Sequence, residues 1–379
     1  MASTTDVGRT APSEPLFDLR PCLRDPVFGL VSDRWKLAPV TAGLGFLGLY
    51  FGGNLLCCWL SGTALPRPGL DASFVQDRVA LVLYLFLVPL ATALATRFYR
   101  QVAGAFERLY TEGTVRAPVA EYNVYLRHLH ARYNSLVLHL VALGLAILVL
   151  GCLTCENQFD GERAWLDLGM GVGAIYHLLL ALVAWYSAIL VLAKVVITAR
   201  AIHRVFDWPV DIQPAHPDGC GGFRLFSDIA VTIALFSASM GTATVLVALA
   251  DWLLYGVPPS PARVVVAVVL QALTPLAFFT CLYRAHRVMK VAKETMMRQV
   301  HELYQDSFRG LQAGLARGEV ADQAREEVLG LESLHGVVRR LPVWPTNTGM
   351  LGQVLLSIAL PVGLIVVQII LESVVSRGR

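Results

Sequence analysis

The stretch Leu136–Cys155, LVLHLVALGLAILVLGCLTC, decides the fold of this chain. It holds 20 residues, and none of them is Asp, Glu, Lys or Arg. A helix needs about 20 apolar residues to cross the hydrocarbon core of a bilayer, which is roughly 30 Å thick. The stretch therefore predicts a membrane-spanning helix.

Six further apolar stretches of comparable length lie before and after it. They are Leu37–Leu60, Val79–Thr96, Leu168–Ala193, Ile229–Ala250, Val264–Tyr283 and Met350–Leu371. Across the 379 residues 55% are hydrophobic and only 16% are charged, whereas a soluble domain has about 25% charged residues. The sequence therefore predicts an all-α fold, a polytopic transmembrane helical bundle with seven spans.

The seventh stretch, 350–371, is the least regular because Pro361 and Gly363 lie near its middle. Its 22 residues are enough for a full crossing, which is the interpretation that we favour. The alternative is a re-entrant segment that returns the C-terminus to the side from which it came. That alternative leaves six spans.

The basic residues predict the orientation in the membrane. The leader holds five Lys or Arg, the second-to-third connection six, the fourth-to-fifth four and the sixth-to-seventh ten, so that 25 of 31 share one side. The alternate connections hold only four. Because basic connections stay in the cytoplasm, we predict a cytoplasmic N-terminus. The excess of Arg over Lys is typical of a GC-rich bacterial genome, so we predict the bacterial cytoplasmic (inner) membrane.

The parts outside the bilayer are predicted from their helical periodicity. Residues 1–36 form a cytoplasmic leader, partly disordered, with an interfacial helix over Pro15–Val31. The bundle covers 37–283 and includes a cytoplasmic helical extension over 97–135 and a loop over 194–225. Residues 284–341 contain two amphipathic patterns separated by Gly314 and Gly318, which predict a cytoplasmic helical hairpin.

The most distinctive string lies in the loop before the fifth span. It contains His216, Asp218, Cys220, Gly221 and Gly222. Turn formation is the first interpretation, since Pro-Asp-Gly favours a tight turn. Two functional alternatives remain open: an anion site built from glycine N–H groups beside a helix N-terminus, and a metal site using His216, Asp218 and Cys220. We predict no bound cofactor, because no Walker or dinucleotide pattern is present.

The HPDxxGG string, followed by Pro342-Val343-Trp344-Pro345 before the last span, resembles uncharacterised bacterial multi-pass membrane proteins. The resemblance is confined to these two short strings. It implies a multi-pass fold and assigns no activity.

His139 and His177 lie within predicted spans. Ionisable residues at such depth usually face the bundle interior and suggest a proton or ion pathway. At 1.5 Å per residue their depths differ by roughly 10 Å, so we expect no direct contact between them. The alternative is a neutral histidine that is hydrogen-bonded to a neighbouring helix.

Four cysteines lie at one predicted depth on the outer face. Cys57 and Cys58 end the first span, and Cys152 and Cys155 end the third. The outer face of a bacterial inner membrane is oxidising, so a disulfide between these helix ends is one prediction. Small apolar packing by free thiols is the alternative.

These observations leave three functional hypotheses. The first is an ion or small-solute channel or transporter, which the intramembrane histidines and proline-containing spans favour. The second is a membrane-embedded enzyme or binding protein that uses the His216–Gly222 loop. The third is a scaffold that docks a soluble protein through 284–341. The expected partners are the lipid bilayer, further copies of the chain and a cytoplasmic protein. The net charge of +3 argues against nucleic acid.

Overall fold

The computed structural model describes residues 15–66, 73–155, 171–214, 216–255, 261–316, 322–346 and 349–356, with 359, 363 and 366. Within these ranges all regular structure is helical, and the only β feature is an isolated bridge between Val115 and Val210. The predicted all-α fold is confirmed.

Six helical stretches are long and apolar enough to cross a membrane within the described part of the chain. The first three stretches are composite, because short π-helical segments or a break divide them. They are α1 (Pro39–Leu47), η2 (Gly48–Gly52) and α2 (Gly53–Leu60); α3 (Arg78–Val82), η3 (Leu83–Leu87) and α4 (Val88–Thr111); and α5 (Val119–Tyr133) with α6 (Leu136–Cys155). The other three are continuous helices: α7 (Val172–Val205), α8 (Arg224–Tyr255) and α9 (Pro261–Ala316).

The seventh predicted span, 350–371, lies mostly outside the described residues. Its first residues, 349–356, are helical, and the side chain of Val354 is buried in the main core.

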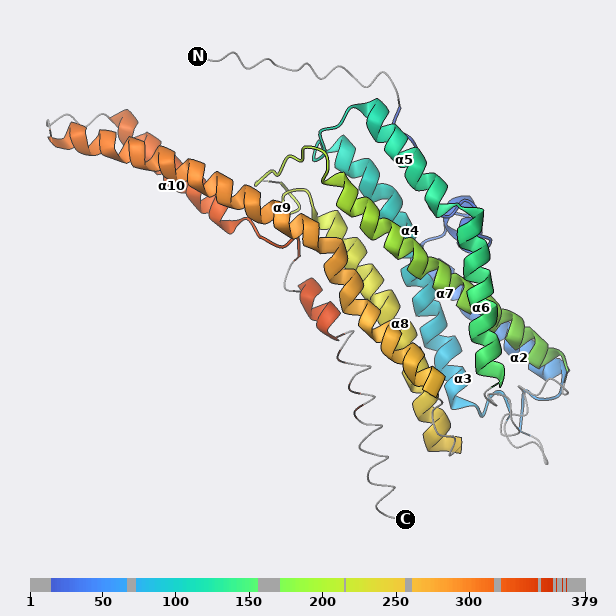
Figure 1. Ribbon diagram of the computed structural model, residues 1–379. Coiled ribbons are helices and arrows are strands. Elements are labelled where there is room, and N and C mark those ends of the chain that lie inside the picture. The colour runs from blue at the N-terminus through green and yellow to red at the C-terminus, as the bar shows by residue number, and fades with distance from the viewer. Residues whose placement is uncertain are drawn as a thin grey trace.

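Helix α8 is the centre of the bundle and α6 is at its edge. In the most apolar window of α8, 72% of the residues are buried, against 11% in the corresponding window that contains α6. Helix α8 packs against α4 and α9, whereas α6 packs mainly against α7 (Figure 1). The exposed side of α6 is formed by Leu and Val side chains, as a lipid-facing surface requires.

Local sequence signals explain where helices begin and how closely they approach. The Asp77 carboxylate accepts hydrogen bonds from the N–H groups of Val79 and Ala80, which caps α3. Helices α1 and α4 meet where a Cβ on Gly43 would lie 2.7 Å from the Pro89 carbonyl oxygen. Glycine is therefore required at that contact.

The leader and the connections that are rich in Lys and Arg lie at one end of the bundle (Figure 1). Figure 1 shows the docked leader, the α4–α5 turn, the α7–α8 loop and the far half of α9 at this end, and the α2–α3 and α8–α9 ends at the other. We call the first of these the leader end.

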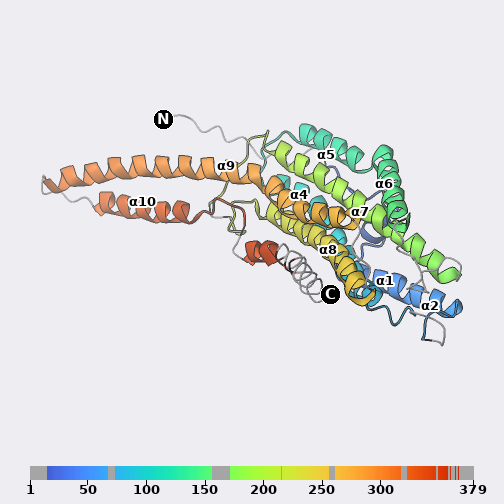
Figure 2. The ribbon, with the colours of Figure 1, turned by 60° about the horizontal axis from the view of Figure 1, so that its bottom comes forward.

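Helix α9 continues far beyond the bundle and pairs with α10 (Asp322–Arg340). The two helices form an arm that projects from the leader end (Figures 1 and 2). In the part of α9 that leaves the bundle, less exposed positions recur with alternating spacings of four and three, as in a coiled coil; this series is Lys293, Met297, Val300, Tyr304, Ser307, Leu311 and Gly314, and Ala292 and Met296 lie beside it. The helix runs through Gly314, so the predicted turn is not at that glycine.

Candidate functional site: a buried lysine under the leader

The leader forms part of the packed core rather than an interfacial helix. Its described residues before the π-helical segment η1 (Gly29–Arg34) contain no helix longer than a turn, because Pro15, Pro21 and Pro26 interrupt the chain. Cys22 has an exposed fraction of 0%, and Leu19, Phe28 and Val31 are also buried. The prediction of an interfacial helix over Pro15–Val31 was therefore wrong.

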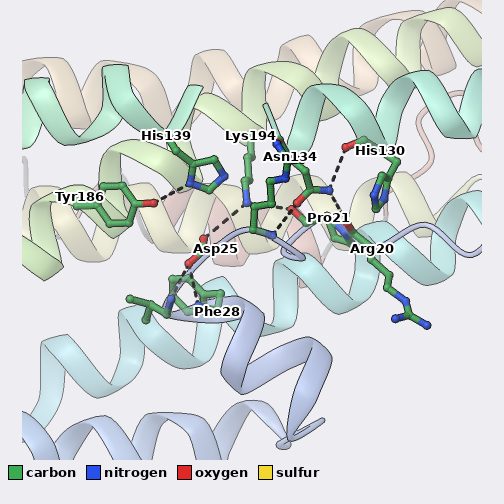
Figure 3. A network of polar contacts seen from close by, with 11 residues as sticks. Arg20, Pro21, Asp25, Phe28, His130, Asn134, His139, Tyr186 and Lys194 are labelled. Atoms are coloured by element: carbon green, nitrogen blue, oxygen red, sulfur yellow. Dashed lines mark hydrogen bonds and ion pairs between the residues drawn. The ribbon is translucent and has the colours of Figure 1, made fainter. Parts of the chain in front are cut away.

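Asn123 of α5 and Asn134, the C-cap residue of that helix, bind the backbone of the leader. The Asn123 side chain accepts a hydrogen bond from the Phe17 N–H at 2.8 Å. Asn134 accepts one from the Arg24 N–H at 3.0 Å and donates one to the Arg20 carbonyl at 2.9 Å (Figure 3). Since the extended leader has no helical hydrogen bonds of its own, these side chains pair with its backbone N–H and carbonyl groups and fix its position along the bundle.

Below this segment, Lys194 of α7 is completely buried. Its exposed fraction is 0%, and that of Asp25 is 3%. The ammonium donates a hydrogen bond to the Pro21 carbonyl at 2.9 Å and lies 3.6 Å from Asp25 Oδ2 (Figure 3). It also lies 4.9 Å from the centroid of the Tyr99 ring, a cation–π distance. The leader therefore supplies the counter-charge for a lysine of the bundle.

The other oxygen of Asp25 shapes the turn. Oδ1 accepts hydrogen bonds from the N–H groups of Val27 and Phe28, both at 2.9 Å. Burial raises the pKa of the neighbouring Cys22 thiol well above its usual range, even though Lys194 opposes that shift. Cys22 therefore stays a protonated thiol and is not a reactive nucleophile.

Three buried polar atoms in and beside this ion pair have no hydrogen bond from a described residue. They are Asp25 Oδ2, which belongs to the pair, and the Tyr99 hydroxyl and His139 Nε2 next to it. His139 is within electrostatic range of both Lys194 and Asp25. Because unsatisfied buried polar groups are rare in native structures, such a cluster indicates a place where water or an ion belongs.

The structure places the two predicted intramembrane histidines against tyrosines. His139 Nδ1 lies 2.7 Å from the Tyr186 hydroxyl, and His177 Nδ1 is hydrogen-bonded to the Tyr84 hydroxyl. Each histidine thus joins two helices, α6 to α7 and η3 to α7. They form two separate pairs, as their different depths predicted.

An apolar cavity of about 120 Å³ lies between α1, α4, α7 and α8. Ser187 of α7 faces it, and Phe28 of the leader closes one part of its wall. Helix α7 therefore presents His177, Ser187 and Lys194 in succession over about 25 Å.

The loop over His216–Gly222 is an internally satisfied turn. The Asp218 carboxylate accepts hydrogen bonds from the N–H groups of Cys220 at 2.7 Å, Gly222 at 3.0 Å and Arg224 at 3.2 Å. Although burial alone would raise it, the pKa of Asp218 is lowered by these N–H groups and by His216. The amides that the anion interpretation required are thus occupied by the loop's own carboxylate.

The metal interpretation of this loop has no support among the residues that the structure describes. His216 Nδ1 lies 2.8 Å from Asp218 Oδ1, but Cys220 is buried and its thiol pKa is raised by burial. In the described ranges no group of three or more His, Cys, Asp or Glu side chains could hold a metal ion.

The loop instead joins several connections at the leader end. Gly221 has a φ of +66° and Gly222 a φ of +96°, and a Cβ on Gly222 would lie 2.7 Å from the Thr114 hydroxyl of the α4–α5 turn. The Ser227 hydroxyl, one turn into α8, donates to the Pro345 carbonyl. The HPDxxGG and Pro-Val-Trp-Pro strings therefore flank the same end of α8.

The predicted disulfide does not form in the described part of the chain. Cys57, Cys58 and Cys152 are free thiols, and the side chain of Cys155 lies outside the described residues. Helix α7 explains this, because α2 and α6 both pack against it. A Cβ on Gly173 of α7 would lie 3.0 Å from Cys58 Sγ, so that thiol packs on α7, while Cys152 is exposed.

The Lys194–Asp25 pair is the site that sequence reasoning missed. Lys194 was counted only as a basic residue of a connection, and Asp25 lay within the predicted interfacial helix over Pro15–Val31. One signal was present: Lys194 is one of four lysines in the chain and interrupts the apolar run VLAKVVIT.

Comparison of the chain with protein-family models, with curated proteins and with solved structures found no match. The fold alone therefore defines the class: this is a multi-pass membrane protein whose buried polar site lies under its N-terminal leader.

Proposed function

We propose that the protein is a gated pathway for a small ion in the bacterial inner membrane, with its N-terminus in the cytoplasm. The orientation is supported by the 25 basic residues that the sequence assigns to one side. Its likeness to bacterial multi-pass proteins in two short strings stays a prediction.

The observation on which the proposal depends is the burial of Lys194 against Asp25. Removing two charges from water costs several kcal/mol per ion, and well-packed apolar residues are often as stable as the pair that they replace. A buried ion pair is therefore weak support for a purely stabilising role. In a membrane protein, ionisable residues inside the bundle usually mark the route of an ion.

The pair has the properties of a latch. Asp25 and Lys194 belong to different elements, their closest charged atoms are 3.6 Å apart, and no hydrogen bond joins them. The leader is otherwise held by neutral contacts: hydrogen bonds to Asn123 and Asn134, and packing of its apolar side chains in the core. Release of the leader would uncover Lys194, the unsatisfied Tyr99 hydroxyl and His139 Nε2.

The route that we propose follows α7. It begins at the His177–Tyr84 pair, passes Ser187 and ends at Lys194 below the leader. The apolar wall between these polar stations would resist water while the gate is closed, since hydrophobic constrictions gate channels by dewetting. The docked leader corresponds to the closed state.

The experiment is an ion flux assay on the purified chain in liposomes, with H⁺, K⁺ and Cl⁻ as separate probes. Asp25→Asn removes the charge of the latch and keeps an oxygen that can accept the turn's N–H bonds. We expect it to raise the flux of one of these ions several-fold over the wild type. Asp18→Asn is the matched control, because Asp18 is an exposed aspartate of the same leader that pairs with Arg20. No flux from either the wild type or Asp25→Asn between pH 5 and 8 would refute the proposal.

The scaffold hypothesis is a second candidate, favoured by the arm formed by α9 and α10. The arm extends away from the bundle (Figure 2), and its exposed residues include Arg298, Glu302, Asp306 and Arg309. If it docks a cytoplasmic protein, shortening the arm should leave the ion flux unchanged and abolish that association in cells. The enzyme hypothesis loses its main support, because the Asp218 carboxylate is occupied by its own loop.

A further inference from the structure

The apolar cavity beside Ser187 lies on the proposed route, but its lining supports an inference that does not require ion movement. It has a volume of about 120 Å³, lies between four helices and is partly open to the surface of the bundle. An engineered apolar cavity of about 150 Å³ stays free of water and binds benzene or xenon. The cavity here approaches that size and is lined mainly by Leu, Val, Ala and aromatic side chains.

Two π-helical segments border this cavity. Tyr50 lies in η2, and Leu83 and Leu87 lie in η3; all three line the cavity. The hydroxyl of Tyr50 donates to the Leu180 carbonyl of α7, so the widened turn of η2 is held against that helix. Single π-helical turns inside α-helices are frequent at functional sites. Two of them at one cavity are a second observation that points to a ligand.

Two side-chain hydroxyls in the cavity wall, those of Thr92 and Ser187, make no hydrogen bond to a described residue. The oxygen of Ser187 is buried and makes no hydrogen bond there. By contrast, Ser239, which also lines the cavity, donates to the Phe236 carbonyl at 2.7 Å. A buried water needs two to four polar partners, whereas this wall is almost entirely apolar apart from the Thr92 and Ser187 hydroxyls. Water is therefore a poor occupant, and a mostly apolar molecule with one hydrogen-bonding atom is a good one.

We infer that this cavity is a binding site for an apolar ligand: an alkyl or aryl group that has at most one polar atom, directed at Ser187. Two sources can supply such a group, namely a free lipophilic molecule and the end of a lipid chain. Because Phe28 of the leader forms part of the wall, a ligand in the cavity would contact the docked leader directly.

The test uses benzene and phenol on the purified full-length chain, with the thermal unfolding midpoint as the measurement. Both ligands should raise the midpoint of the wild type in a concentration-dependent way. Phenol should bind about fivefold more tightly than benzene, since its hydroxyl can pair with Ser187. Ser187→Ala should remove that preference. Ser237→Ala is the matched control, because its hydroxyl is also buried and unpaired in the described structure but does not line the cavity.

Filling the cavity should abolish binding. Ala188→Leu places a larger side chain in the wall, and Ala193→Leu on the same helix is the control, since Ala193 does not line the cavity. If Ala188→Leu fails to fold, Ala184→Val is a smaller filling change in the same wall. Binding of xenon to the wild type, followed by ¹²⁹Xe NMR, provides a measurement that needs no variant.

The medium distinguishes the two sources of the ligand. Binding of benzene both in detergent and in lipid nanodiscs would indicate a site for free lipophilic molecules. Binding in detergent that disappears in nanodiscs would indicate that a lipid chain occupies the cavity. No benzene or xenon binding in either medium, or equal binding by the wild type and a folded Ala188→Leu variant, would overturn the inference.

Discussion

Two aspartates at the leader end both accept backbone hydrogen bonds within a turn, but only one of them also pairs with a residue far away in the sequence. Asp218 uses both carboxylate oxygens to accept N–H groups of its own loop. Asp25 uses Oδ1 in the same way, for Val27 and Phe28, but its Oδ2 faces Lys194 without a hydrogen bond. The Asp218 carboxylate therefore bonds only within its own turn, whereas the Asp25 carboxylate connects its turn to α7.

The difference separates a structural turn from a candidate switch. The partners of Asp218 lie within six residues of it, so they form as soon as the loop folds. Lys194 is 169 residues from Asp25, so their pairing exists only while the leader is docked. A distinctive local sequence therefore marks the internally satisfied turn, and an unremarkable one marks the candidate switch.

The largest effect that we expect comes from breaking the Lys194–Asp25 pair. Lys194→Gln leaves the Asp25 charge buried without a counter-charge, and breaking such a pair costs about 3–5 kcal/mol. We expect this loss in the free energy of unfolding, measured by denaturant titration in detergent.

The double variant tests the origin of that loss. Asp25→Asn combined with Lys194→Gln leaves no buried charge, so it should be more stable than Lys194→Gln alone. Lys290→Gln is the control, because Lys290 forms only an exposed pair with Glu294 at 4.0 Å, and surface changes of this kind stay within about 0.5 kcal/mol. Equal losses for the single and double variants would show that packing, rather than the unpaired charge, dominates at this position.

A smaller loss in the free energy of unfolding is expected at the turn that Asp218 holds together. Asp218→Ala removes the acceptor of the Cys220, Gly222 and Arg224 N–H groups, and hydrogen bonds to a charged group contribute about 1.5–3 kcal/mol. We expect a loss of about 2–3 kcal/mol, because the bonds share one carboxylate and are not additive. Asp218→Asn keeps one carbonyl oxygen and should lose less. If ion flux changed in Asp218→Ala at unchanged stability, the turn would be more than structural.

The membrane spans were predictable because they depend on local composition. Leu136–Cys155 was predicted with the bounds that α6 has, since a run of apolar residues without charges has one stable environment. The continuation of α4 and α9 beyond the membrane was also predictable, because helical periodicity extends past the apolar runs. Only the end of α9 differs, since that helix runs through Gly314.

The leader site could not be predicted, because it is a tertiary arrangement. Pro15, Pro21 and Pro26 exclude a helix there, but nothing local shows that Asn134 and Lys194 bind the resulting extended chain. The disulfide prediction failed for the same reason: equal depth in the membrane does not make two helices neighbours, and Cys58 packs on Gly173 of α7.

The smallest expected effect is a pH dependence of stability that comes from Asp218. The pKa of Asp218 is lower in the folded protein than its ordinary value, since the N–H groups of its loop outweigh the effect of burial. On acidification the unfolded chain therefore takes up the proton first, and stability falls. The contribution of Asp218 should be complete above about pH 4, the ordinary pKa of an aspartate, and should disappear as the pH drops through the lower value in the folded state. Unfolding midpoints measured from pH 6 to pH 2 should show this acid limb in the wild type and a weaker one in Asp218→Asn, which has no proton to gain at that position. An identical acid limb in both proteins would mean that other carboxylates produce it.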